Sequence, residues 1–108
     1  MDKIGMREWI AALELVLDNK LKKWKKESRI ENGEAVQIEW QFGQTHIIAD
    51  IFWQNDRESV HLQLHSPRTS QRYEWHGLTD KTFNKIMDRV GNWAQITMYP
   101  PEDYVSEM

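Results

Sequence analysis

The stretch VQIEWQFGQTHIIADI, residues 36–51, decides the fold of this chain. Residues 36–42 alternate between apolar and polar side chains, which is typical of a strand with one buried face. Gly43-Gln44 then predicts a two-residue hairpin turn with glycine first. If this turn pairs Phe42 with Thr45, the inward residues of both arms meet one another: Trp40 with Ile47, Ile38 with Ala49 and Val36 with Ile51. The stretch therefore predicts an antiparallel hairpin with one apolar face.

Two further strands are predicted downstream. Residues 60–65 and 71–76 alternate in the same way, and a loop containing Ser66-Pro67 joins them. The expected partners are Leu64 with Tyr73, Leu62 with Trp75, Trp53 with Val60 and Ile51 with Leu62. These pairings extend the hairpin into a four-stranded antiparallel meander.

Helical periodicity flanks the meander. Apolar residues recur at spacings of three and four from Met6 to Trp24, which predicts an amphipathic helix. Thr79 is the expected N-cap of a second helix that ends at Gly91. A short fifth strand is allowed over residues 93–99, before two prolines. Each helix has one apolar side, so both are expected on the same face of the sheet, and the predicted fold class is α+β.

Six tryptophans occur in the 108 residues. Five fit core positions by periodicity: Trp9, Trp24, Trp40, Trp53 and Trp75. Trp93 follows the predicted helix end, and two roles stay open for it. It either joins the second helix to the sheet or contacts a partner.

The segment KLKKWKKESR, residues 20–29, is predicted to be the end of the first helix. On a helical wheel Trp24 lies on the apolar side, and the opposite side carries Lys22, Lys25, Lys26 and Arg29. Cations there also suit the negative end of the helix dipole. The segment is therefore expected to be a solvated cationic end. The alternative is non-sequence-specific nucleic-acid binding, with these four cations on the phosphates.

Composition and charge limit the classes of protein. Hydrophobic residues make up 40% of the chain and charged residues 29%, which is typical of a folded domain. We expect one domain over residues 1–101, followed by an acidic, flexible tail over 102–108. The chain has no cysteine, which excludes disulfides, thiol catalysis and zinc–thiolate sites. No targeting segment and no membrane span are recognised, so a cytoplasmic protein is expected. Residues 1–29 carry eight positive and five negative charges and the rest carry six and twelve, which favours a protein partner with a basic surface over DNA.

The candidate site lies on the sheet face opposite the helices. Alternation directs polar side chains there, and the predicted partner-binding residues are Ile48, Asp50, Phe52, His61, His65, Arg72, Glu74 and His76. The expected cross-strand neighbours are His61 with His76, His65 with Arg72 and Gln63 with Glu74. All four histidines fall on this face, but no metal-ligand spacing motif accompanies them, so no metal and no cofactor is predicted. Acid–base catalysis by Asp50, His61 or Glu74 is a weaker alternative.

Ile48 and Phe52 are the large apolar residues of this otherwise polar face. Apolar side chains among polar neighbours often mark a contact surface. The competing interpretation is that the second helix or the tail covers them.

A small protein-binding module is the predicted function. It would act by steric occlusion or escort, as an inhibitor, an immunity or anti-defence protein, or a secretion chaperone. A homodimer through an edge strand is a further expectation. The layout is similar to double-stranded-RNA-binding domains and type III secretion chaperones, but Thr79, Asp80, Lys81 and Thr82 stand where the first family has a basic helix start. No enzyme activity and no membrane contact are expected.

Overall fold

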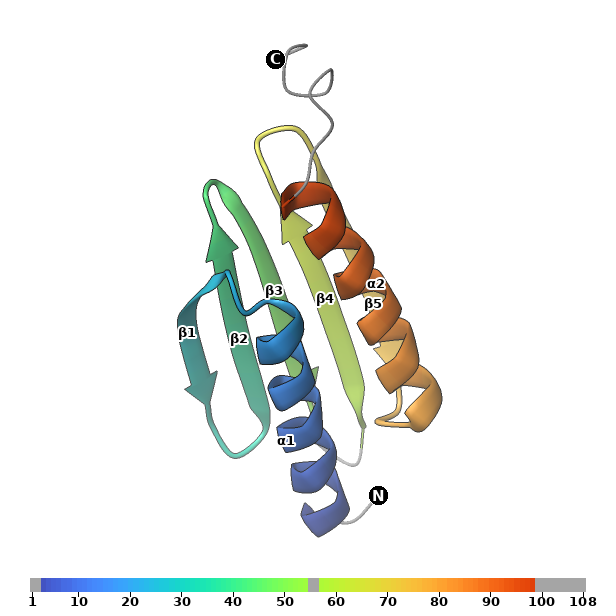
Figure 1. Cartoon of the computed structure of the whole chain (residues 1–108). Helices are drawn as coiled ribbons and strands as arrows, with labels where there is room; N and C mark the ends of the chain where they lie inside the picture. The colour runs from blue at the N-terminus through green and yellow to red at the C-terminus, as the bar shows by residue number, and fades with distance from the viewer. Residues whose placement is uncertain (1–2, 55–56, 99–108) are drawn as a thin grey trace.

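Two helices cover one face of a five-stranded sheet. The computed structural model describes residues 3–54 and 57–98. Within them the elements are α1 Lys3–Lys20, β1 Lys25–Glu31, β2 Ala35–Phe42, β3 Thr45–Phe52, β4 Ser59–His65, β5 Ser70–His76 and α2 Asp80–Met98. The sheet is antiparallel throughout, in the order β1-β2-β3-β4-β5. Both helices lie on the same side of it, with α2 over β4 and β5 (Figure 1), so the predicted α+β class is confirmed.

The hairpin of β2 and β3 has the predicted register. Phe42 lies opposite Thr45, and the inward pairs continue as Trp40 with Ile47, Ile38 with Ala49 and Val36 with Ile51. Gly43 has a φ of 61°, in the left-handed region that favours glycine, which explains its place in the turn. Val36, Ile38, Trp40, Ile47, Ala49 and Ile51 are all buried. Turn chemistry and alternation together were sufficient to set this register.

The other two registers differ from the prediction by two residues. Ile51 pairs with Val60 instead of Leu62, and Leu62 pairs with Tyr73 instead of Trp75. Trp53 is not available to β4, because its backbone NH bonds the carbonyl of Glu34 at 2.9 Å and its indole Nε1 bonds the carbonyl of Gly33 at 2.7 Å.

The loop between β4 and β5 is also tighter than predicted. The NH of Ser66 donates to the carbonyl of Thr69 at 2.9 Å, and the NH of Thr69 donates to Ser66 Oγ at 3.1 Å. Pro67 and Arg68 are therefore the central residues of a four-residue turn, a position that suits proline. Because side chains alternate with a period of two, a shift of two residues leaves every side chain on its predicted face.

The first helix ends at Lys20, and the basic segment continues as a turn and then as β1, which corrects the predicted helical end. The NH of Trp24 bonds the carbonyl of Leu21 at 2.9 Å, so the chain turns tightly toward the sheet. A helix from α1 to Arg29 would be about 40 Å long, whereas a strand of eight residues spans about 26 Å. Turning after Lys20 keeps the helix within the sheet and gives β2 a second neighbour.

The second helix continues through Gly91 to Met98, so residues 93–98 are helical and the predicted strand there is wrong. Thr79 caps the helix as predicted, because its Oγ1 accepts the NH of Thr82 at 3.1 Å. A helical glycine costs about 1 kcal/mol relative to alanine, and burial of Val90, Trp93 and Ala94 offsets that cost. The fifth strand of the sheet is instead β1. Tyr99 and the predicted tail over 102–108 lie outside the described residues.

The core fills the space between the sheet and the helices. Trp9, Trp24 and Trp40 are buried as predicted, and Trp53 and Trp75 are partly buried against the core. Trp93 belongs there too, because it is 3% exposed and its Nε1 donates to Gln71 Oε1 at 3.3 Å. Trp93 therefore joins α2 to β5. Neither α1 nor α2, over residues 3–54 and 57–98, is long and apolar enough to cross a membrane.

Candidate partner-binding face

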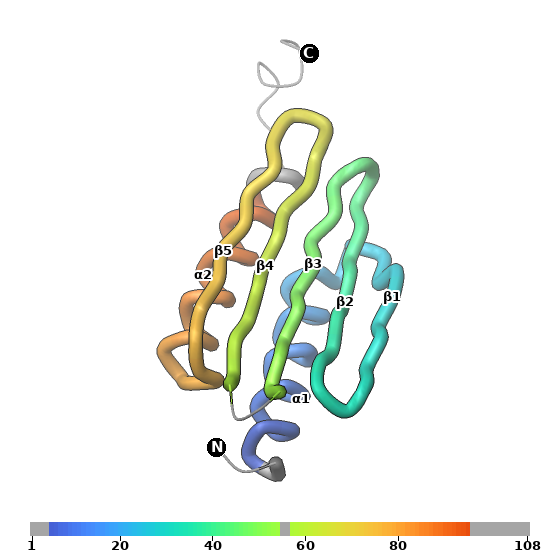
Figure 2. The backbone as a smooth tube through the Cα atoms, turned by 180° about the vertical axis from the view of Figure 1, so that it is seen from behind, coloured from blue at the N-terminus to red at the C-terminus, as the bar shows by residue number. Residues whose placement is uncertain are grey.

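The outer face is the side of the sheet turned away from α1 and α2. Figure 2 views the sheet from this side, with both helices behind it. Covering of Ile48 and Phe52 by α2 is thereby excluded, and the tail lies outside the described residues. Both side chains are half-buried among their neighbours. Ile30, on β1, adds an apolar side chain that is 62% exposed.

A hydrogen-bonded group centred on His61 occupies β4 and β5. His61 lies opposite Glu74, not His76, and its Nε2 is 2.6 Å from Glu74 Oε1. Arg72 Nη2 is 2.8 Å from His61 Nδ1. Because guanidinium can only donate, Nδ1 accepts and the ring proton lies on Nε2, directed at Glu74. Both ring nitrogens of His61 are therefore occupied.

The remaining histidines are separated along the same face. His46 Nδ1 lies 2.8 Å from Glu39 Oε2, and His76 Nε2 lies 3.4 Å from Glu74 Oε2. His65 lies opposite Ser70, not Arg72, while Arg72 takes the place opposite Gln63 that was predicted for Glu74. In the part of the chain that the structure describes, no three histidine or carboxylate side chains are grouped closely enough to hold a metal ion.

A hollow of about 500 Å³ opens on the outer face above β1 to β5. Asp50 lies at its base with 9% of its surface exposed, between Gln37 on β2 and His61 on β4. Apolar walls are supplied by Ile30 and Phe52, and polar atoms by Asn32, Gln37, Gln63 and Arg72. The hollow thus combines a buried carboxylate with apolar walls.

Four of the predicted site residues line this hollow: Asp50, Phe52, His61 and Arg72. Ile48, His65, Glu74 and His76 share the outer face but not the hollow. Alternation had already placed Gln37 and Gln63 on this face, whereas Ile30 and Asn32 had no such signal. Ile30 was missed because the residues just before it, 20–29, were predicted to be the end of a helix. Only the pairing of β1 with β2 places Ile30 on the outer face.

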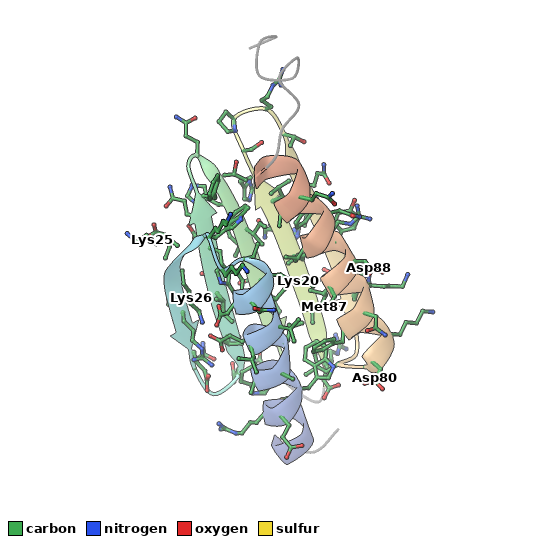
Figure 3. The ribbon with its side chains drawn as sticks, in the orientation of Figure 1. Lys20, Lys25, Lys26, Asp80, Met87 and Asp88 are labelled. Carbon is green, nitrogen blue, oxygen red and sulfur yellow. The ribbon has the colours of Figure 1, made fainter. Side chains whose placement is uncertain are left out.

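The four predicted phosphate-binding cations do not share one surface. Lys26 and Arg29 lie opposite the inward residues Trp40 and Ile38, on the helix side of β1. Figure 3 shows Lys25 and Lys26 on β1, away from Lys20 at the end of α1. Lys25 Nζ lies 3.7 Å from Glu27, and Lys22 is exposed in the turn. The four cations therefore cannot bind phosphates together on one surface.

Glu14 of α1 pairs with both inward cations. Arg29 Nε donates to both carboxylate oxygens of Glu14, at 2.9 and 3.0 Å. Lys26 contacts Glu14 and also lies 3.1 Å from Asp18 Oδ2. Hydrogen bonding to Glu14 raises the pKa of Arg29. Burial lowers the pKa of Lys26, but its bonds to Glu14 and Asp18 outweigh burial, so that pKa is raised. These contacts join α1 to β1.

Comparison with known proteins gives no match to this arrangement. No family model, no curated protein and no solved structure matches the chain. Any proposal about the function must therefore be based on the geometry of the outer face.

Proposed function

We propose that the chain is a small cytoplasmic protein-binding module that captures a partner protein on its outer face. The observation that carries the proposal is that α1 and α2 leave one face of the sheet uncovered, and that this face carries apolar side chains and a buried carboxylate. A protein held there would be blocked from its own target or escorted to it. Inhibitor, immunity protein and secretion chaperone are the classes that act in these ways.

The composition of the outer face supports this proposal. Ile30, Ile48 and Phe52 give it apolar area, and charged or amide side chains surround them. Protein interfaces have the same pattern of an apolar centre within a polar rim. Catalysis is a weaker use of the same residues, because both nitrogens of His61 already have partners within the sheet.

The area of the face sets the size of the contact. Five strands about 4.8 Å apart and about 25 Å long present roughly 500 Å² in projection. A standard interface buries about 800 Å² on each partner. A partner that covers the outer face would therefore also contact its borders, such as the turns that join the strands.

The charge of the chain favours a basic partner. The net charge is −3, and residues 30–108 hold twelve acidic against six basic residues. Complementary charge speeds the encounter of two proteins more than it raises their affinity. We therefore expect association to slow as salt is added.

Site-directed photocrosslinking in cells of the source organism tests the proposal. A photoreactive phenylalanine analogue at Ile30 or Phe52 samples the outer face, and the same analogue at Leu15 is the matched control. Leu15 is also apolar and is 71% exposed, but it lies on α1. We expect one discrete adduct from both outer positions and none from Leu15.

The identity of the adduct separates the alternatives. A different protein supports the proposal, and a second copy of the chain would instead support the homodimer. An adduct with nucleic acid, equal labelling from Leu15, or no adduct from either outer position would contradict the proposal.

A further inference from the structure

We infer that the hollow at Asp50 receives a basic side chain of the partner, an arginine, with the Asp50 carboxylate as its counter-ion. This inference rests on the proposed function and names the group that the outer face recognises. It is carried by the burial of Asp50, by its lack of a partner among residues 3–54 and 57–98, and by the chemistry of the surrounding walls.

Asp50 is a buried carboxyl side chain that receives no hydrogen bond from the residues that the structure describes. Its side chain lies in the middle strand of the sheet and only 9% of the residue is exposed. Within residues 3–54 and 57–98, no hydrogen bond and no ion pair reaches its carboxylate. Burial of an ionised carboxylate is unfavourable unless a donor or a cation accompanies it. The carboxylate lines the hollow, where a cation or donor that enters from outside the chain can reach it.

The neighbours of Asp50 are committed elsewhere. His61, directly across on β4, accepts from Arg72 through Nδ1 and directs its Nε2 proton at Glu74. Its ring therefore has no proton left for Asp50. This pattern leaves the carboxylate open on the side of the hollow.

The walls of the hollow suit a guanidinium group better than an ammonium group. Guanidinium is planar, forms paired hydrogen bonds with a carboxylate and stacks on aromatic rings. Phe52, the next outer-face residue after Asp50 on β3, supplies a ring that packs beside His61, and Ile30 supplies an aliphatic surface for the methylene groups of the side chain. The amide oxygen of Gln37 can accept a remaining donor, whereas that of Gln63 already lies 2.8 Å from His65 Nε2 and has only its second lone pair to offer.

Arg72 at the border of the hollow is the group that opposes a cation. Its guanidinium is held by His61, and Glu74 in the same hydrogen-bonded group carries the opposite charge. Its repulsion is therefore reduced but not removed. Loss of this positive charge should strengthen binding of a cation.

An open hollow on a sheet face favours a side chain brought by a protein over a free small molecule. Sites for small molecules enclose most of their ligand. Here the space opens across the sheet surface, so an isolated ligand would keep much of its contact with water. The body of the partner would provide the missing enclosure, and an arginine probe alone should bind only in the millimolar range.

A titration of the full chain with N-acetyl-arginine amide, followed by NMR of backbone amides, tests the inference. N-acetyl-citrulline amide is the neutral probe of nearly the same shape. We expect saturable shifts at residues around Asp50 and Phe52 with arginine and none with citrulline. Asp50→Asn should weaken arginine binding at least tenfold, and Arg72→Gln should strengthen it.

Glu39→Gln is the matched control, because Glu39 is another outer-face carboxylate whose partner is His46. It should leave arginine binding unchanged, and the dispersed spectrum of each variant reports that it is folded. Equal binding by citrulline, equal binding by Asp50→Asn, or no saturable shift would overturn the inference. So would a response to acetate, centred on Arg72, in place of arginine.

The outcome is separable from that of the proposed function. Photocrosslinking at Phe52 that persists in Asp50→Asn, together with absence of arginine binding, would contradict the arginine site and leave the partner-binding face supported. Arginine binding without any crosslinked protein would contradict the proposed function and leave the cation site supported.

Discussion

Replacing Glu14 by Gln should weaken the attachment of β1 to α1. Glu14 is the common partner of Arg29 and Lys26, and its side chain is only 15% exposed. Glutamine keeps the size of the side chain but removes its charge, so two cations lose their main partner. Lys26 keeps Asp18 and Arg29 keeps Glu31, at 3.1 and 3.0 Å, so the loss is partial.

The size of the effect follows from exposure. Hydrogen bonds to charged groups contribute about 1.5–3 kcal/mol when buried, and exposed ion pairs contribute about 0.2–1 kcal/mol. The side chains of Lys26 and Arg29 are 34% and 40% exposed, which places this cluster between the two limits. We expect Glu14→Gln to lower the free energy of unfolding by about 1–2 kcal/mol, since exposure discounts the buried value.

A double-mutant cycle in urea measures the interaction itself. Glu14→Gln, Arg29→Gln and the double variant should show a coupling of roughly 1 kcal/mol that declines with added salt. Glu8→Gln, an exposed position on the same helix, is the control and should have little effect.

The cycle also distinguishes the two structures of the basic segment. If α1 continued to Arg29, fifteen residues would place Glu14 about 22 Å away along the helix axis, and no coupling would arise. A coupling of zero, or an effect no larger than that of Glu8→Gln, would refute the pairing of β1 against α1.

Three further predictions concern the helices and alkaline pH. Gly91→Ala should raise the free energy of unfolding by about 0.5–1 kcal/mol, because Gly91 is helical and the added methyl group would meet only the end of a lysine side chain, at 3.8 Å. A loss of stability on urea unfolding would contradict a helix through this residue. Thr79→Ala should cost about 1 kcal/mol in the same assay, and Thr79→Ser should retain most of the cap. Burial lowers the pKa of Lys26, but its bonds to Glu14 and Asp18 outweigh burial, so that pKa is raised above 10.5. The contribution of Lys26 to stability is therefore complete below pH 10.5 and is lost as the pH rises through the folded-state pKa. Lys26→Met should flatten this part of the pH dependence of stability, and an unchanged profile would show that the pairing is not responsible.

Sequence reasoning succeeded where the determinants are local. The turn at Gly43 and the alternation around it fix both the pairing and the faces of β2 and β3. The register of β4 against β3 failed because it depends on Trp53 binding the loop before β2, which is a tertiary contact. The register of β4 against β5 failed because the turn from Ser66 to Thr69 is tighter than the predicted loop. The outer face was nevertheless identified, since an error of two residues preserves the side of each residue.

The basic segment failed for a different reason. Leu21 and Trp24 continue the helical spacing and are buried, but they reach the core from a turn. Burial at a spacing of three or four therefore did not require a helix there. The error concealed β1, and with it Ile30 and the hollow that Ile30 helps to form.

The two-layer arrangement of sheet and helices has a consequence for how this protein can vary. Along β2 to β5, residues of one parity form the core and residues of the other parity form the outer face. Substitutions at outer positions such as Gln37, Gln63 and Arg72 change what the face presents without altering the packing beneath it. If the outer face binds a partner as proposed, the positions that select the partner and those that stabilise the fold alternate along each strand and form separate sets. The same stable chain could acquire a new partner by changing every second residue of its strands.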